Sequence, residues 1–157
     1  MHHKHSFRRK LQTFFLSLLL VLLTVAGVPS AAYTAEAASA DTTMAVHFLD
    51  VGQGLSILVQ SQNLLYDGGD RGHSSFVVSY LQKQNISIID YMISSHYDED
   101  HVAGLVGCLD SFSVKNVIGA DYVQDTKIYQ SFENSVAAQG LTVQHPEPGT
   151  DFTFGSG

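Results

Sequence analysis

The sequence predicts an α/β fold of the α+β kind, because short apolar strands alternate with amphipathic helices from residue 44 onwards. The chain has 157 residues, 45% of them hydrophobic, which fits one globular domain rather than a disordered chain. Polar and charged side chains follow two of the expected strands, at 67–70 and 94–101. Since α/β proteins tend to hold their sites at strand ends, these two segments are the first candidates for function.

The first forty residues have the layout of a secretory signal peptide. A basic segment at 4–10 precedes an apolar stretch at 11–28 and small residues at 30–40. Ala38-Ser39-Ala40 supplies the A-x-A cleavage pattern, which predicts an extracellular mature chain that starts at Asp41 and has no stable membrane association. The alternative is an uncleaved membrane anchor, because about 18 mostly apolar residues are just long enough to span a bilayer.

The expected mature chain is strongly acidic. It holds four Lys and Arg against fourteen Asp and Glu, so its formal charge is 4 − 14 = −10. Its overall field does not attract nucleic acid or anionic membrane, so a phosphate-bearing substrate would have to be held by metal and by local groups. Cys108 is the only cysteine. No intramolecular disulfide is therefore possible, and its place on an apolar helical face indicates a small core residue.

The first expected strands cover 44–50 and 55–60, and Val51-Gly52-Gln53-Gly54 connects them. Two glycines in so short a connection predict a tight hairpin with positive φ. The G-x-G pattern does not indicate a dinucleotide loop, because Ile57 occupies the third glycine position and no helix follows. A third short strand at 64–66 ends in Asp67-Gly68-Gly69-Asp70.

Helices and strands alternate along the rest of the chain. Ser74 or Ser75 is available to cap the first helix, Asp125 or Thr126 to cap the third, and Gly140 is well placed to end the third. The expected elements are a helix at 72–84, a strand at 88–93, a helix at 101–109, a strand at 114–118, a helix around 128–136, a strand at 141–145 and a turn at 146–149.

The segment from Ser94 to His101 concentrates metal-binding chemistry, with two imidazoles and three carboxylates in six residues. Imidazole nitrogen and carboxylate oxygen are ligands of borderline divalent metals such as zinc, and carboxylates also suit manganese. Alternate side chains of an extended loop share a side, so His96, Asp98 and Asp100 can point one way while His101 approaches from the first helical turn. We interpret these four residues as candidate ligands of one ion or a close pair.

A solvated loop is the alternative interpretation of this segment, since Asp and His are common at helix N-caps. An EF-hand calcium loop is excluded by spacing, because counting from Asp98 puts Ala103 where glycine is required. The segment also leads into a helix N-terminus, whose dipole favours a bound hydroxide or phosphate oxygen. That suits metal-assisted hydrolysis of an anionic ester better than a purely structural metal.

Three ordered motifs resemble the metallo-β-lactamase superfamily. His96-x-Asp98-x-Asp100-His101 is similar to its H-x-[HD]-x-D-H signature. With Phe48-Leu49-Asp50-Val51-Gly52-Gln53-Gly54 and Leu64-Leu65-Tyr66-Asp67-Gly68-Gly69, it looks like the branch typified by the extracellular domain of the DNA-uptake protein ComEC. The resemblance runs from about residue 45 to at least 110. It implies a four-layer αββα sandwich, of which residues 41–157 would form the N-terminal half, incomplete at the C-terminus.

The resemblance implies a two-metal hydrolase. His96 and Asp98 would coordinate one ion and Asp100 and His101 the other, both zinc or manganese, with Asp100 also acting as the catalytic residue that orients the attacking water. Asp67 would be the buried carboxylate that hydrogen-bonds the metal loop from the neighbouring strand end. Two such ions activate water and polarise a phosphoryl or carbonyl group, so the implied substrate is a phosphodiester or another ester, DNA among them.

Two other classes of function stay open. A non-catalytic exported module would bind metal without turnover, and a membrane-tethered surface protein would keep its N-terminal segment. The superfamily normally takes further ligands from the second half of the sandwich, including an aspartate that bridges the ions, and the motifs above do not supply them. A half sandwich would also expose one apolar sheet face, so we expect a tendency to aggregate or dimerise, although the sequence predicts no particular oligomer.

Overall fold

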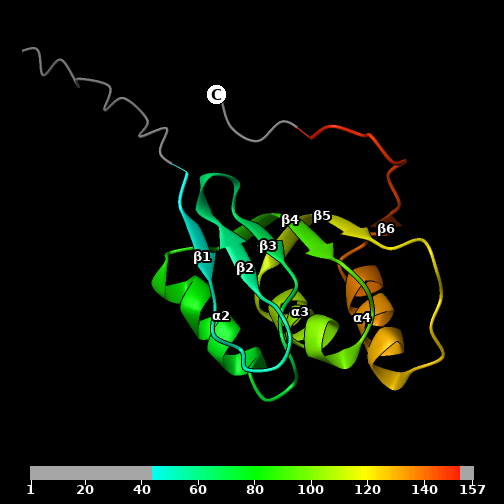
Figure 1. The fold of residues 1–157 in the computed structure, drawn as a ribbon, viewed down its shortest axis with the longest axis horizontal. Helices are drawn as coiled ribbons and strands as arrows, with labels where there is room; N and C mark the ends of the chain where they lie inside the picture. The colour runs from blue at the N-terminus through cyan, green and yellow to red at the C-terminus, as the bar shows by residue number, and fades with distance from the viewer. Residues whose placement is uncertain (1–43, 153–157) are drawn as a thin grey trace, which may run out of the picture. The chain divides into compact units, whose positions relative to one another are not determined.

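The computed structural model of the chain describes residues 44–152, so the predicted signal peptide at 1–40 lies outside the described residues. These residues form a six-stranded sheet in the order β1-β2-β3-β4-β5-β6, with three helices packed against it (Figure 1). The predicted mixed α/β class is therefore confirmed. None of the helices within 44–152 is both long and apolar enough to cross a membrane.

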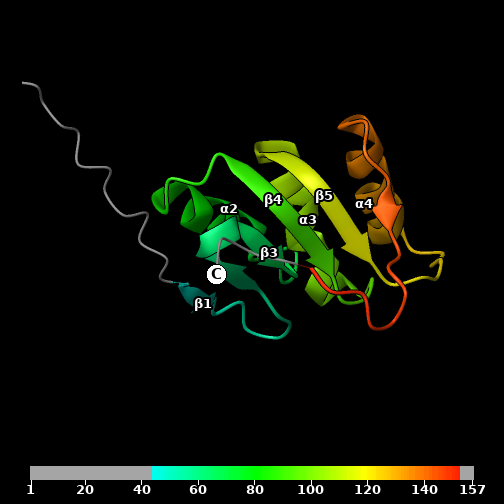
Figure 2. The ribbon, with the colours of Figure 1, turned by 90° about the horizontal axis from the view of Figure 1, so that it is seen from above.

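The observed elements follow the predicted order closely. They are β1 (Val46–Phe48), β2 (Ile57–Val59), the 3-10 turn η1 (Gln60–Gln62), β3 (Leu64–Tyr66), α2 (Ser74–Lys83), β4 (Ile88–Ser94), α3 (Glu99–Ser111), β5 (Ser113–Gly119), α4 (Lys127–Ala138) and β6 (Val143–Gln144). The first three strands pair antiparallel, and β3 to β6 pair parallel. One helix connects each pair of neighbouring parallel strands from β3 to β6. Such connections are right-handed as a rule, and the strands follow one another in chain order across the sheet, so α2, α3 and α4 lie on the same face (Figure 2).

The core lies between that face and the helices. Strand register aligns Leu58, Leu65, Met92 and Val117 across four neighbouring strands, and all four side chains are fully buried. They pack against the apolar stripes of the helices in one cluster that includes Cys108. Burying this apolar surface is the main force that holds the layers together.

The opposite face of the sheet is also apolar. Phe48, Ile57, Tyr66 and Ile93 align across β1 to β4, and no helix of the described part covers them. Phe48 is 76% exposed, whereas Tyr91 on the same face contacts the Phe152 ring with centroids 6.2 Å apart. The expected exposed apolar face is thus present at the β1 side of the sheet.

The predicted tight hairpin between β1 and β2 is wrong. The Leu49 N–H donates to the Ser56 carbonyl at 3.0 Å, and the six residues between them form a wide loop. Gly52 and Gly54 do have the expected positive φ values of 64° and 115°. The loop is wide because it extends to the start of α3, where a Cβ on Gly54 would lie 2.0 Å from the Asp100 carbonyl oxygen.

Helix starts were predicted with mixed success. Thr126 caps α4 as expected, because its side chain accepts a hydrogen bond from the Tyr129 N–H. Neither Ser74 nor Ser75 caps α2, since Asp70 accepts the His73 N–H at 2.9 Å and the helix has already begun at Ser74. Helix α3 begins at Glu99, two residues before the predicted position. Its first turn, residues 99–101, is polar and therefore gives no hydrophobic pattern.

Candidate functional site

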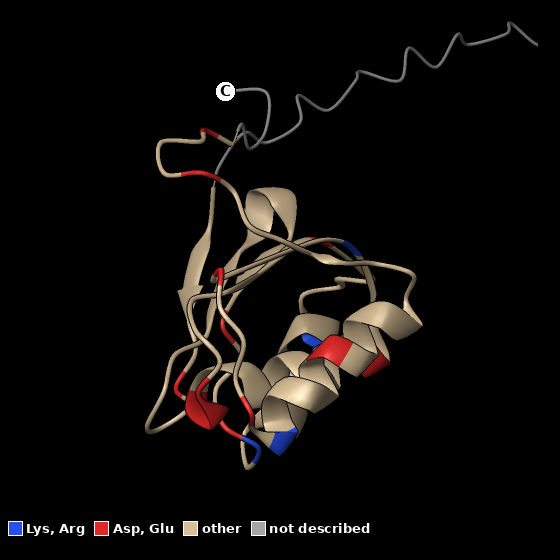
Figure 3. Ribbon diagram, turned by 90° about the vertical axis from the view of Figure 1, so that its right-hand side faces the viewer, with Lys and Arg blue, Asp and Glu red and all other residues tan. Residues whose placement is uncertain are grey.

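The candidate site lies where β3 and β4 end, beside the first turn of α3, which is acidic (Figure 3). β3 and β4 are parallel, so Asp67 after β3 and the segment after β4 emerge side by side. The Asp67 N–H donates to the Ile93 carbonyl at 2.8 Å and extends the pairing by one residue. The two segments that the sequence marked as first candidates, 67–70 and 94–101, therefore begin along one edge of the sheet. Asp67 has a φ of 55°, a left-handed conformation that Asp tolerates better than most residues.

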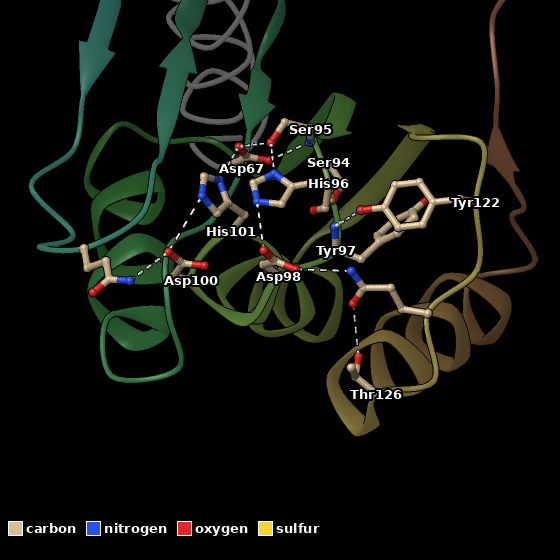
Figure 4. Close-up of polar contacts among 12 residues, drawn as sticks. Asp67, Ser94, Ser95, His96, Tyr97, Asp98, Asp100, His101, Tyr122 and Thr126 are labelled. Carbon is tan, nitrogen blue, oxygen red and sulfur yellow. Dashed lines mark hydrogen bonds and ion pairs between the residues drawn. The ribbon is translucent and has the colours of Figure 1, made fainter.

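The Asp67 carboxylate is fully buried and organises the site. It accepts hydrogen bonds from the Ser95 N–H at 2.8 Å, from the Ser95 hydroxyl at 2.7 Å and from His101 Nδ1 at 2.9 Å (Figure 4). A buried carboxylate is costly unless it is hydrogen-bonded, and here three donors satisfy it. Asp67 thereby ties the end of β3 both to the β4–α3 loop and to the first turn of α3.

This network also sets the tautomers of the two imidazoles. The Ser95 hydroxyl gives its one hydrogen to Asp67, so it accepts from His96 Nδ1, which lies 2.9 Å away. His101 Nδ1 donates to Asp67 directly. Both rings therefore carry hydrogen on Nδ1 and keep the Nε2 lone pair free, which is the arrangement typical of metal-binding histidines. The ring centroids are 3.9 Å apart.

Each free Nε2 faces a carboxylate (Figure 4). Asp98 Oδ2 lies 3.5 Å from His96 Nε2, and Asp100 Oδ2 lies 3.8 Å from His101 Nε2. Asp98 accepts a hydrogen bond from the Gln124 amide at 3.1 Å, and the Gln53 amide lies 3.4 Å from Asp100. One correction concerns Asp100, which lies in α3 rather than on the extended loop as predicted.

The four predicted ligands are thus neighbours, arranged as two His–Asp pairs. Their donor types, two imidazole nitrogens and two carboxylates, suit zinc or manganese. Within residues 44–152 no three His, Cys, Asp or Glu side chains converge on a common point that could hold an ion. The metal roles of His96, Asp98, Asp100 and His101, and the catalytic role of Asp100, therefore stay predictions.

Two glycines allow α3 to approach the end of β3. The Gly68 N–H donates to the His101 carbonyl at 2.7 Å, and the Gly104 N–H donates to the Gly69 carbonyl at 3.0 Å. A Cβ on Gly104 would lie 1.8 Å from the Gly68 carbonyl oxygen. Only glycine permits this contact, which brings the first turn of α3 close enough for His101 to reach Asp67.

Tyr97 anchors the middle of the β4–α3 loop in the core. Its side chain is fully buried, its hydroxyl donates to the Ala120 carbonyl at 2.8 Å, and its N–H donates to the Tyr122 hydroxyl at 3.2 Å. Desolvation raises the pKa of Tyr97 above its ordinary value, with a smaller contribution from the nearby Tyr129. The phenol stays neutral, so Tyr97 holds the loop in place and leaves proton transfer to other groups.

Two further residues with reactive side chains lie outside the cluster, and Cys108 is the small core residue that the sequence indicated. Cys108 is fully buried in the core, and desolvation raises the pKa of its thiol to about 12, which excludes it as a nucleophile. His145 is exposed, and its Nδ1 lies 3.1 Å from the Gly119 carbonyl, away from the candidate ligands. In the β3–α2 loop, a hydrogen bond from the His73 side chain lowers the pKa of Asp70 below its ordinary value.

Sequence reasoning missed Ser95, Gln53 and Gln124. Ser95 precedes His96 directly, but nothing in the sequence indicates that its hydroxyl relays between Asp67 and that imidazole. Gln53 lies in the connection at 51–54, but nothing in the sequence indicates its contact with Asp100. The contact of Gln124 with Asp98 spans 26 residues and has no local signal.

Comparison with known proteins adds one finding. The family model of the metallo-beta-lactamase superfamily matches residues 49–152, which include every described strand and helix after β1. No curated protein matches the chain.

Proposed function

This chain belongs to the metallo-beta-lactamase superfamily, and from that premise we propose that it is a secreted, metal-dependent hydrolase of phosphodiesters or related esters. Superfamily members are generally hydrolases and usually bind divalent metals such as zinc. Neither statement fixes a substrate, since one fold serves many chemistries. The proposal therefore depends on the side chains of the site.

The orientation of the two histidines is the observation that carries the proposal. A fully buried carboxylate, Asp67, acts on His101 directly and on His96 through Ser95, and both Nε2 lone pairs are left facing Asp98 and Asp100. In a merely solvated loop, no such buried network would be needed to fix two imidazole tautomers. The arrangement supports a metal site over the solvated-loop interpretation.

We assign His96 and Asp98 to one divalent ion and Asp100 and His101 to a second, with zinc or manganese as the metal. Bound there, such ions would supply Lewis acidity toward the scissile group and toward water. The protein's own contribution is to hold the donors. Asp67 keeps both Nδ1 atoms protonated, directly for His101 and through Ser95 for His96. Asp100, whose Oδ2 lies 3.8 Å from His101 Nε2, would orient the water and accept its proton.

An anionic ester is the substrate class that the site favours. The candidate ligands precede and begin α3, so the N-terminal N–H groups of a 13-residue helix point toward the reaction zone. The similarity to ComEC, a DNA-uptake protein, favours a phosphodiester, with DNA as one substrate. The acidic mature chain would not collect nucleic acid through its bulk field, which favours short substrates held locally.

Hydrolysis of bis(p-nitrophenyl) phosphate tests the proposal. We expect turnover in zinc or manganese, loss of turnover in chelator and recovery on adding metal back. His96→Ala and Asp100→Ala should each lower kcat by about 100-fold or more, because each removes a candidate ligand or the water-orienting group. His145→Ala is the matched control, since that histidine is exposed and outside the site. Unchanged turnover in the first two variants would end the hypothesis.

Two alternatives give different results in simple assays. A non-catalytic metal-binding module would bind zinc in the wild type and lose affinity in His96→Ala, with no hydrolysis of any ester. A membrane-tethered protein would sediment with membranes, whereas a secreted one would be recovered from the medium with Asp41 as its first residue. The second assay tests the export proposal independently of the chemistry.

A further inference from the structure

A pocket of ≈ 370 Å³ opens beside Asp98. Its volume lies within the range of roughly 300–1,000 Å³ that ligand pockets usually have. It is bounded by the β3–α2 loop, the β4–α3 loop and the start of α4. The lining residues are Arg71, Tyr97, Asp98, Glu99, Gln124, Thr126, Lys127 and Ile128, and we call this the Arg71–Lys127 pocket.

The pocket gathers cations that are scarce elsewhere. Residues 44–152 contain only four Lys and Arg, and two of them, Arg71 and Lys127, line this one pocket. Lys83 lies in the last turn of α2, at the opposite end of that helix, and the ammonium of Lys115 pairs with Asp90. Half of these cations therefore lie beside the candidate metal ligands, in a lining that also holds the carboxylates of Asp98 and Glu99.

Both cations are available to a ligand. Arg71 forms an ion pair with Glu99 at 3.2 Å, but the side chains are 71% and 57% exposed, so the pair contributes little and can be exchanged. Lys127 forms no ion pair within 4 Å among the described residues. Arg71 lies in the β3–α2 loop and Lys127 is the first residue of α4. A guanidinium and an ammonium suit a phosphate group, since the guanidinium can donate two parallel hydrogen bonds.

We propose that the Arg71–Lys127 pocket is a subsite for a second phosphate group of the substrate, one nucleotide removed from the scissile phosphodiester. Phosphate binding in the pocket can be tested by itself, but its role in hydrolysis rests on the proposed function. If both hold, the substrate class is narrowed to short oligonucleotides. Asp98 adjoins both the pocket and His96, so a phosphate in the pocket places the neighbouring phosphodiester next to the candidate metal ligands.

Phosphate binding to metal-free protein tests the subsite without requiring turnover. In chelator, thymidine 5′-monophosphate and thymidine are titrated separately and followed by amide chemical shifts. The monophosphate should bind at least about tenfold more tightly than thymidine and should shift the amides of Arg71 and Lys127, as expected for charge-assisted contacts. In the double variant Arg71→Gln/Lys127→Gln this preference should fall to about twofold or less, whereas Lys83→Gln should keep it. Equal affinity for the two ligands in the wild type, or an unchanged preference in the double variant, would overturn the proposal.

A second measurement separates this proposal from the hydrolase itself. With zinc or manganese, kcat/KM is compared for the dithymidine phosphodiester with and without a 5′-phosphate. The phosphorylated dinucleotide should be preferred by about tenfold, and the double variant should lose that preference while it still hydrolyses the unphosphorylated form. Absence of hydrolysis of both dinucleotides would contradict the proposed function, and the binding titration would still decide the subsite. A wild type that hydrolyses both dinucleotides equally well would overturn the subsite.

Discussion

The site has two regions that are held in different ways. The base consists of Asp67, Ser95, His96 and His101, joined by hydrogen bonds of 2.7–2.9 Å around a carboxylate with no exposed surface. The rim consists of Asp98 and Asp100, whose side chains are 62% and 29% exposed. Rim contacts are longer, at 3.1–3.8 Å, and two of them come from glutamine amides on other loops.

The difference separates preorganisation from adaptability. The base fixes two nitrogen donors whether or not an ion is present, because its hydrogen bonds converge on the fully buried carboxylate of Asp67. Rim carboxylates are held by fewer and longer contacts, so they can rotate toward an ion at little cost. Substitutions in the base should therefore lower both stability and metal binding, whereas substitutions at the rim should lower metal binding alone.

The largest effect on stability is expected at the glycine contact beneath the base. Gly104→Ala places a Cβ 1.8 Å from the backbone of Gly68, where no side chain can move aside, so the free energy of unfolding should fall by about 3 kcal/mol or more. Gly107→Ala in the same helix is the control. Its new Cβ meets only the Ser74 hydroxyl, which can rotate, and alanine favours helix by up to about 1 kcal/mol. Urea unfolding measures both, and equal stability of the two variants would contradict the described packing.

Removal of the buried carboxylate should have the next largest effect. Asp67→Ala leaves the Ser95 N–H and His101 Nδ1 without an acceptor in a closed environment, and we expect a loss of about 2–3 kcal/mol. Asp50→Ala is the control, because that carboxylate is exposed and accepts one long bond from the Gly52 N–H. A change below about 0.5 kcal/mol for Asp67→Ala would mean that the base does not organise the site.

Rim substitutions should leave the fold intact. Asp98→Ala and Asp100→Ala should each change the free energy of unfolding of metal-free protein by about 0.5 kcal/mol or less, since surface contacts of this kind contribute little. The same variants should lose the stabilisation that added zinc gives to the wild type. Thermal unfolding with and without zinc separates the two effects, and a large loss of stability in chelator would erase the distinction between base and rim.

The smallest effect is expected at the far end of α3. The raised pKa of Cys108, about 12, keeps its thiol neutral in the folded protein, so native protein should not react with a thiol-specific reagent at pH 8. The stability that accompanies this neutral thiol is present below its ordinary pKa and is lost as pH rises through about 12. Protein unfolded in guanidinium should react at once, and equally fast reaction of the native protein would show that α3 is not packed as described.

The sequence predicted the position of the site better than the hydrogen bonds within it. Short apolar runs and helical spacing located every described strand and helix, and the residues after β3 and β4 indicated a shared edge. The tight β1–β2 hairpin was wrong because the need for that loop to reach Asp100 is a tertiary contact, invisible in local turn chemistry. The early start of α3 was missed because its first turn is polar.

The hydrogen-bond network of the site depends on contacts between segments that are distant in the sequence. Asp67 and His101 are 34 residues apart, and Gln53 and Asp100 are 47 apart. Periodicity and motif spacing carry no information on which side chains meet across loops. The buried position of Asp67 could be expected only from the resemblance to a family, and the relay through Ser95 could be expected from neither source.

Zinc affinity measured by competition with a chromophoric chelator tests the central claim most directly, namely that the four residues at this edge bind metal. The wild type should compete for zinc, the double variants His96→Ala/Asp98→Ala and Asp100→Ala/His101→Ala should each bind less, and His145→Ala should match the wild type. Full zinc affinity in both double variants would contradict the account, because the metal would then be bound elsewhere in the chain.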